Sequence, residues 1–429
     1  MGGLQNVVVV FDNSLCVYHA GQEVTGRIVL SLKDQKKVDK ILVEFKGKAK
    51  THWSRHHGKS STHYSSEEYY FNSTWDSGYV QASGGSDARV ISAGSHRIPF
   101  SFQLPPDLPS SFEGPHGHIR YTCTVRLVRS WKFDITCRRP FTVIAREDLN
   151  AIPSASQPLS VCESTSVECC CIPRGTITAS LAVPKRGFVP GEGISLSFDV
   201  TNNSTRVIKR IIARVKQYVV YRGTSFWGYE DTKNTSIEVA RITADTPVRS
   251  GTTGKWNNSQ LTVPAVPPSL VSCSIIDVSY VLKVEIDRHI NFMLPLIIGT
   301  VPLRGNYRQP VSQTPPVDNN YRVTRHFADS NVTPAIGPPP SFDEALMPSG
   351  QNVLYSTVGH RPETPPPSYQ ECVFGSFNIV ETDDGNECAL GVTEFAPRYV
   401  FYSRDTLLQN QPGVRPNPTP DSERSPLLS

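Results

Sequence analysis

A proline-rich segment late in the chain has the spacing of a peptide ligand. It contains the pattern Pro-Pro-x-Tyr, formed by Pro366, Pro367 and Tyr369. Consecutive prolines restrict φ and pre-form a polyproline II helix, so docking orders little additional backbone. SH3 and WW domains bind such helices in aromatic grooves. In a WW-type ligand, Pro367 would stack between aromatic rings and Tyr369 would fill a second pocket.

A near copy of this motif lies upstream. It is formed by Pro339, Pro340 and Phe342, where Phe342 takes the tyrosine position without a hydroxyl. The alternative is a solvated proline-rich spacer that binds no partner. A second copy favours a WW ligand, although the two sites would add avidity only if both bind measurably.

Three adjacent cysteines offer a different chemistry. Zinc sites usually use spaced pairs, because neighbouring side chains such as those of Cys169, Cys170 and Cys171 cannot easily converge on one tetrahedral ion. Thioacylation is the specific role that suits such a cluster. Reduced thiols packed at a domain junction are the simpler alternative.

Histidines gather in a polar segment of the first part of the chain. His52, His56, His57 and His63 accompany Arg55 there, without carboxylate or cysteine partners. A solvated loop explains them better than a metal site. The chain also has no glycine-rich phosphate loop, Gly-x-Ser-x-Gly elbow or His-Glu-x-x-His motif. We therefore predict no enzyme, no catalytic residue, no metal and no cofactor.

The last residues fit an acidic-dileucine pattern. Glu423 precedes Leu427 and Leu428 at the spacing of a clathrin-adaptor sorting signal, which supplies an acid for a basic patch and two leucines for an apolar pocket. Clathrin adaptors are therefore candidate partners. A plain disordered terminus is the alternative.

Composition restricts the class of protein. The 429 residues suggest two or three domains, and 43 basic against 39 acidic residues give a charge too mild to indicate nucleic acid. The start has no charged and apolar pattern of a signal peptide, and no run approaches the roughly 20 apolar residues of a membrane span. We expect a cytoplasmic chain whose 10 cysteines are reduced.

The elements that would position these motifs are predicted to be strands. Residues 41–45, 98–104 and 121–127 are short apolar or alternating runs between Gly and Pro turns. Long helical periodicity is absent, which indicates an all-β sandwich or barrel. The polar segment 51–85 is predicted to be a long hairpin loop.

The second part of the chain repeats the first. The Tyr18-x-x-Gly21 pattern recurs as Phe188-x-x-Gly191, and Tyr121 recurs as Tyr280 with the same apolar spacing after it. Such self-similarity indicates duplicated units. The predicted domains are a β-sandwich over 6–148, a Cys/Ser/Pro linker over 149–175, a second sandwich over 176–303 and a disordered tail over 304–429. Within the tail, residues 399–402 are predicted to be a docking segment.

The chain resembles the α-arrestins, the arrestin domain-containing proteins. The resemblance rests on residues 17–26, on 111–121 with the sequence SFEGPHGHIRY, on 185–192 with KRGFVPGE, and on 294–302 with LPLIIGTVP. It implies two tandem immunoglobulin-like arrestin β-sandwiches followed by a tail with Pro-Pro-x-Tyr motifs.

The resemblance also implies an adaptor. Family members engage membrane receptors or transporters as cargo and recruit HECT-type ubiquitin ligases through WW domains, so the protein is expected to associate peripherally with the plasma membrane and endosomes. Two alternatives remain open. One is a trafficking scaffold without ubiquitin chemistry, and the other is a thioredoxin-binding regulator acting through Cys273. The sequence leaves the cargo and the ligase open.

Overall fold

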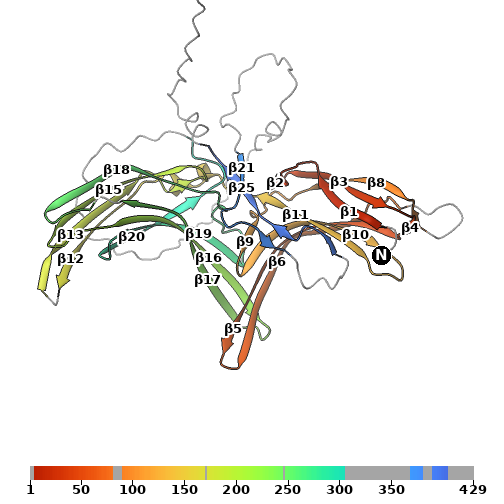
Figure 1. Cartoon of the computed structure of the whole chain (residues 1–429), viewed down its shortest axis with the longest axis horizontal. Helices are drawn as coiled ribbons and strands as arrows, with labels where there is room; N and C mark the ends of the chain where they lie inside the picture. The colour runs from red at the N-terminus through yellow and green to blue at the C-terminus, as the bar shows by residue number, and fades with distance from the viewer. Residues whose placement is uncertain are drawn as a thin grey trace, which may run out of the picture. The chain divides into compact units, whose positions relative to one another are not determined.

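The computed structural model describes residues 4–80, 89–169, 172–244, 247–304, 368–379 and 389–403. These residues belong to one compact unit and are built almost entirely of strands, with two short 3-10 helices, η1 (Leu149–Ala151) and η2 (Pro153–Ser156), between the halves (Figure 1). No helix within these ranges is long and apolar enough to cross a membrane. The all-β prediction is confirmed.

The first half of the chain forms a two-layered sandwich. One layer is a three-stranded sheet of β1 (Leu4–Phe11), β3 (Glu23–Leu32) and β8 (Gly94–Gln103). The other contains β2 (Val17–His19), β5 (Lys40–His57), β6 (Ser60–Asp76), β9 (Phe112–Gly114), β10 (Gly117–Val128) and β11 (Ile135–Ile144). Short strands β4 (Lys36–Lys37) and β7 (Val90–Ile91) pair at the side. Alternate residues of β3 are buried, because successive side chains of a strand point to opposite faces.

The second half repeats this plan. Its four-stranded layer contains β12 (Leu159–Cys169), β13 (Ile172–Val183), β15 (Gly193–Ser204) and β18 (Thr252–Thr262). Its other layer contains β14 (Gly187–Phe188), β16 (Ile211–Ser225), β17 (Glu230–Ala244), β19 (Ile276–Ile286) and β20 (Ile290–Ile298). Each layer buries an alternating set of β-branched and aromatic side chains against the other.

Equivalent tyrosines show the duplication in atomic detail. The buried hydroxyl of Tyr121 donates to the carbonyl of Pro109 at 2.7 Å, and that of Tyr280 donates to the carbonyl of Pro267 at 2.6 Å. A short parallel strand also lies at the same place in each half, where β2 pairs with β11 and β14 pairs with β20. The prediction of two similar sandwiches in tandem is confirmed.

One sheet continues through both halves. Strand β6 pairs with β16 through Ser65 opposite Thr224 and Tyr64 opposite Ser225, so the long hairpins β5–β6 and β16–β17 lie side by side (Figure 1). The Thr51 hydroxyl donates to the carbonyl of Arg222 at 2.7 Å across this boundary. The halves are therefore joined by backbone pairing as well as by side chains.

Residues 51–76 of the polar segment differ from the predicted loop. Strand β5 continues to His57 and β6 begins at Ser60, with residues paired along the whole hairpin. The Trp53 indole N–H donates to Asp231 at 3.1 Å, and Arg55 forms an ion pair with the same carboxylate. A polar strand can extend this far because its partners in the second half satisfy its polar groups.

Part of the predicted linker is also strand. Residues 159–169 form β12, which pairs with β13 from Leu159 opposite Val183 to Cys169 opposite Ile172. The side chain of Val167, on this strand, is buried. The Ser-rich composition suggested a linker because one face of β12 is polar and exposed.

Two stretches of the predicted disordered tail are ordered strands. The first, 368–379, contains β21 (Ser368–Glu371) and β22 (Phe377–Asn378), and the second, 389–403, contains β23 (Ala389–Gly391), β24 (Glu394–Phe395) and β25 (Arg398–Phe401). Prediction by average composition missed them because a few buried side chains hold them, among them Tyr399 and Phe395, which are 2% and 9% exposed. The expectation that residues 399–402 dock is confirmed.

Candidate functional site

The tyrosine of the Pro-Pro-x-Tyr motif lies in a docked strand. Tyr369 belongs to β21, which pairs antiparallel with β25 so that Tyr369 stands opposite Val400. The Ser368 hydroxyl donates to the carbonyl of Phe401 at 2.9 Å, and Glu371 forms an ion pair with Arg398 at 3.0 Å. The motif tyrosine is thus held on the folded part of the chain.

The Tyr369 hydroxyl is hydrogen-bonded to His19. Its oxygen lies 3.0 Å from Nε2 of His19, on β2 of the first half. Burial, and then the nearby positive charge of Arg146, lower the pKa of His19 to about 4, so the imidazole is neutral near pH 7. Burial raises the pKa of the Tyr369 hydroxyl. The contact is therefore a hydrogen bond between two neutral groups, and the imidazole tautomer decides which of them donates.

An apolar cluster supports the Tyr369 ring. Tyr369 packs against buried side chains from both halves and from the tail, namely Val17, Ile144, Leu149, Ala155, Val189, Val400 and Tyr402. The ring therefore occupies a site whose walls come from distant parts of the sequence.

Two further tyrosines anchor the tail. The Tyr399 hydroxyl donates to the carbonyl of Ser111 in the first half, and the Tyr402 hydroxyl donates to the carbonyl of Thr300 beyond β20, both at 2.8 Å. The Tyr402 backbone N–H donates to the carbonyl of Pro190 at 3.0 Å. Burial raises the pKa of both tyrosines, so both hydroxyls stay protonated as donors. The tail segment is bonded to both sandwiches.

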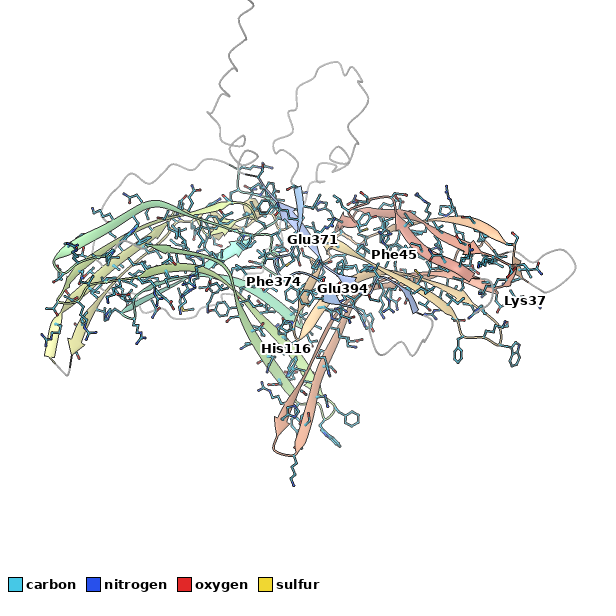
Figure 2. The ribbon with its side chains drawn as sticks, in the orientation of Figure 1. Lys37, Phe45, His116, Glu371, Phe374 and Glu394 are labelled. Carbon is cyan, nitrogen blue, oxygen red and sulfur yellow. The ribbon has the colours of Figure 1, made fainter. Side chains whose placement is uncertain are left out.

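A cavity of about 210 Å³ lies where the tail meets both halves. Phe112 and Gly114 line it from the first half, Tyr221 from β16, and Phe374 and Phe377 from the tail. Figure 2 labels Phe374 close to Glu371 at this junction. The cavity lies between segments that the docked tail holds together.

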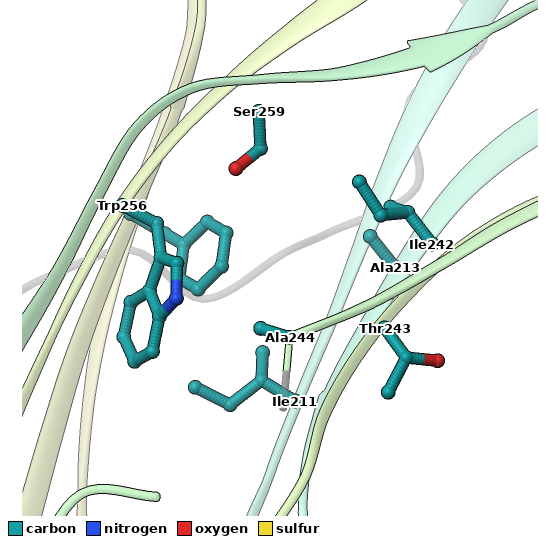
Figure 3. A pocket seen from close by; sticks show the side chains of 8 residues that line it. Ile211, Ala213, Ile242, Thr243, Ala244, Trp256 and Ser259 are labelled. Atoms are coloured by element: carbon teal, nitrogen blue, oxygen red, sulfur yellow. The ribbon is translucent and has the colours of Figure 1, made fainter. Parts of the chain in front are cut away.

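A second cavity, of about 170 Å³, lies between the layers of the second sandwich (Figure 3). Trp256 stacks on Phe198 with ring centroids 4.7 Å apart, and Ile211 and Ile242 line the opposite side. No titratable residue is among the described residues that line it. The cavity thus has the character of a sandwich core rather than of a catalytic site.

Most of the other predicted site residues lie outside the described residues. They are Pro339, Pro340, Phe342, Pro366, Pro367, Cys170, Cys171, Glu423, Leu427 and Leu428. Cys169 is the last residue of β12, and its side chain is also outside the described set. Tyr369 is therefore the residue of the predicted motif that can be placed.

Two histidines of the first hairpin stack on each other. His52 and His63 stack across β5 and β6 with ring centroids 5.8 Å apart. In the described part of the chain, no three His, Cys, Asp or Glu side chains are arranged to hold a metal ion.

Cys273 is a buried thiol at the junction of the halves. Its sulfur lies 3.8 Å from a carboxylate oxygen of Glu68, which also accepts the N–H of Ser274 at 2.8 Å. Burial raises the pKa of the Cys273 thiol. Because the thiolate is the nucleophile, this environment disfavours disulfide exchange.

Buried ion pairs are features that the sequence analysis did not identify. Glu113 accepts two hydrogen bonds from Arg120, at 2.6 and 2.8 Å, and its side chain is 1% exposed. Lys185 forms an ion pair with Glu192 around a turn of the second half. In each case the partners lie seven residues apart across a glycine-containing turn, a spacing that could have indicated the pair.

Comparison with known proteins gives matches over both halves. Residues 7–150 match the family model for the arrestin (or S-antigen) N-terminal domain, and residues 173–303 match that for the C-terminal domain. These two matches cover more than half of the chain.

Individual relatives agree with these matches. The chain is 34% identical to arrestin domain-containing protein 17 of Caenorhabditis elegans, over 93% of this chain and 99% of the relative. It is 28% identical to arrestin domain-containing protein 4 of Mus musculus, over 71% of this chain and 74% of the relative. It is 26% identical to the thioredoxin-interacting protein of Pongo abelii, over 69% of this chain and 75% of the relative.

Proposed function

Since this chain belongs to the arrestin family, among the arrestin domain-containing proteins or α-arrestins, we propose that it is an adaptor between membrane cargo and WW-domain HECT-type ubiquitin ligases. The paired sandwiches would engage a receptor or transporter. Pro366, Pro367 and Tyr369 would engage the WW domain. Cargo would then be ubiquitylated and internalised or sorted, with the adaptor recruited from the cytoplasm to the plasma membrane and endosomes.

The observation that carries this proposal is the Pro-Pro-x-Tyr motif joined to paired arrestin sandwiches. The motif begins at Pro366, and Tyr369 is the second residue of the docked strand β21. The other residues of this strand, Ser368, Gln370 and Glu371, are exposed. Release of this short strand would bring the tyrosine within reach of a second protein. Adaptors need this arrangement, because one surface must stay bound to cargo while another binds the ligase.

Docking of Tyr369 bears directly on how a ligase would bind. A WW domain takes the tyrosine ring into its own pocket. The ring cannot occupy that pocket and also pack against Val400 beside His19. Ligase capture therefore requires β21 to leave this site, and the apparent affinity falls by the fraction of molecules in which it has left.

Titration of an isolated peptide tests the proposal. A peptide covering Glu363 to Val373 would be titrated calorimetrically into a panel of isolated WW domains, beside a Tyr369→Ala peptide. We expect binding by some domains of the panel and loss of that binding in the control. Absence of binding across the panel, or equal binding by the control, would overturn the proposal.

Two other functions depend on residues outside the Pro-Pro-x-Tyr motif. The trafficking scaffold depends on Glu423, Leu427 and Leu428, which lie outside the described residues. It predicts that deletion of the last seven residues stops recruitment to coated membranes. The thioredoxin-binding regulator depends on Cys273, whose burial raises the pKa of its thiol. It predicts that Cys273→Ser prevents thioredoxin co-purification.

A further inference from the structure

A turn of the first sandwich exposes two large aromatic rings. Trp131 and Phe133 lie between β10 and β11, and their exposed fractions are 103% and 79%. Exposed apolar residues usually occur singly on a protein surface. Two rings within three residues, at the end of a hairpin, form a small apolar projection.

The turn is held in place by one acidic residue of its own, Asp134, and by Asp39 from the segment between β4 and β5. The backbone N–H of Arg129 donates to Asp134 at 3.2 Å, and the Ser130 hydroxyl donates to Asp39 at 2.6 Å. The Arg129 guanidinium donates to the carbonyl of Phe133. Trp131 has a φ of 60°, which a bulky residue adopts only where its surroundings hold it. The rings are thus presented by a structured turn.

Positive charges lie beside these rings. Lys36 has a lowered pKa because of burial and then because of the like charges of Arg129 and Lys132, so Lys36 lies close enough to both cations to feel their repulsion. Lys37 follows on β4, and Figure 2 labels it at this end of the first sandwich. Among the described residues, none forms an ion pair with Lys36, Lys37 or Lys132. An anionic partner would relieve this repulsion.

We propose that the surface formed by Lys36, Lys37, Arg129, Trp131, Lys132 and Phe133 binds the anionic face of a lipid bilayer. Trp131 and Phe133 would insert at the level of the headgroups, where aromatic side chains are favoured. The cations would lie against acidic lipid headgroups. This surface is separate from the WW-binding motif, and the inference does not depend on the adaptor function.

The shape of the surface favours a membrane over a peptide or nucleic acid. Both rings project into solvent, and neither lines either of the cavities described above. An acidic peptide would pair with the lysines but would leave the rings in water. A bilayer accommodates both the lysines and the rings, because its acidic headgroups lie directly above apolar chains.

The lysines and the two aromatic rings should contribute separately to vesicle binding. Each lysine removed should weaken vesicle binding by about fivefold at low salt. Removal of both rings should weaken vesicle binding roughly tenfold or more, because the apolar surface that each ring buries in the bilayer is lost. Added salt should weaken binding by the native chain, because it screens the contribution of the lysines.

Vesicle flotation with the full-length chain tests this inference. Vesicles would contain phosphatidylcholine alone or phosphatidylcholine with phosphatidylserine. The variants are Trp131→Ser with Phe133→Ser, and Lys36→Gln with Lys132→Gln. We expect native binding to the phosphatidylserine vesicles, weak binding to phosphatidylcholine alone, and the losses stated above in each variant. Unchanged unfolding temperatures would show that the variants remain folded.

The chain offers a matched control. Phe226 and Trp227, at the turn between β16 and β17, are 92% and 78% exposed and lie beside the acidic residues Glu230 and Asp231. Phe226→Ser with Trp227→Ser should leave vesicle binding unchanged. Equal losses in both aromatic variants would indicate adsorption of any exposed ring and would overturn the inference. Tighter binding to an acidic peptide or to single-stranded DNA than to the vesicles would also overturn it.

Discussion

The hydroxyl oxygen of Tyr369 lies 3.0 Å from Nε2 of His19, although 350 positions separate the two residues in the sequence. Tyr369 ends the Pro-Pro-x-Tyr motif, and His19 lies on the first sandwich. The group that a WW domain would bind is thus already paired within the chain. The accessibility of the motif is therefore determined by the folded domains.

Replacement of His19 should release the motif. In His19→Ala the Tyr369 hydroxyl loses a neutral hydrogen bond worth about 1 kcal/mol, so the full chain should bind a WW domain roughly fivefold more tightly. Calorimetry with the full chain measures this change, and the isolated peptide gives the upper limit. Native chain that binds as tightly as the peptide would show that docking does not limit capture.

Docking should also depend on pH. The docked pKa of His19 is about 4, whereas a released imidazole titrates near its usual value of about 6.5. The released state therefore binds a proton that the docked state excludes. Docking should be strongest above about pH 6.5 and should weaken as the pH falls toward 4, with Arg146 and Tyr369 as the groups that face the ring.

The ratio of the WW-domain affinity of the full chain to that of the isolated peptide measures this pH effect. We expect the affinity of the full chain for a WW domain to approach that of the isolated peptide as the pH is lowered. The ratio cancels the titration of the WW domain itself. In His19→Gln the ratio should not change with pH, and an equally steep change there would assign the effect to another group.

Loss of the Tyr399 hydroxyl should loosen the tail without unfolding the sandwiches. Tyr399→Phe leaves the carbonyl of Ser111 without this donor, at a cost of about 1–3 kcal/mol. Backbone amides of β21 and β25 should exchange with solvent roughly tenfold faster or more, as the same free energy implies. Amides of β10 serve as the internal reference. Equal acceleration in β10 would indicate that the whole first sandwich is destabilised.

The buried pair of Glu113 with Arg120 should be important for stability. Glu113→Gln leaves the guanidinium without its buried carboxylate, which should lower the free energy of unfolding by about 3–5 kcal/mol. Glu371→Gln is the matched control, because that carboxylate is 60% exposed and its pair with Arg398 should contribute less than about 1 kcal/mol. Urea unfolding compares the two variants. Similar small losses in both would contradict the role assigned to Glu113.

Thiol modification should distinguish the cysteines. Cys162 is exposed, whereas Cys273 is buried and burial raises the pKa of its thiol. Brief alkylation of the folded chain should therefore modify Cys162 and leave Cys273 intact until denaturant is added. Mass spectrometry of the digested protein measures both. Rapid modification of Cys273 in the folded chain would restore it as a candidate redox residue.

The sandwiches could be predicted from the sequence because their signals are local. Alternation along residues 121–127 and the correspondence of Tyr121 with Tyr280 depend on neighbouring residues and on a repeated pattern. Both tyrosines then proved to make equivalent hydrogen bonds. Strand periodicity, however, underestimated the first hairpin, where Trp53 and Arg55 find their partner Asp231 in the second half.

The docking of the tail could be predicted only in part. The apolar run at residues 399–402 indicated a docking segment, but its acceptors are the carbonyls of Ser111 and Thr300, which carry no side-chain signal. Tyr369 likewise gave no indication of His19 as its partner. Contacts between residues so distant in the sequence depend on how the two sandwiches fold together.

Because Tyr369 and its site belong to one polypeptide, their association is a first-order process. Dilution or overproduction of the protein leaves the fraction of docked molecules unchanged, whereas the fraction bound to a ligase follows the concentration of free WW domains. The concentration of free WW domain must exceed the intrinsic dissociation constant by a fixed factor before half of the chains are captured. The docked strand would thus set a threshold for ligase recruitment that stays the same at every abundance of this protein.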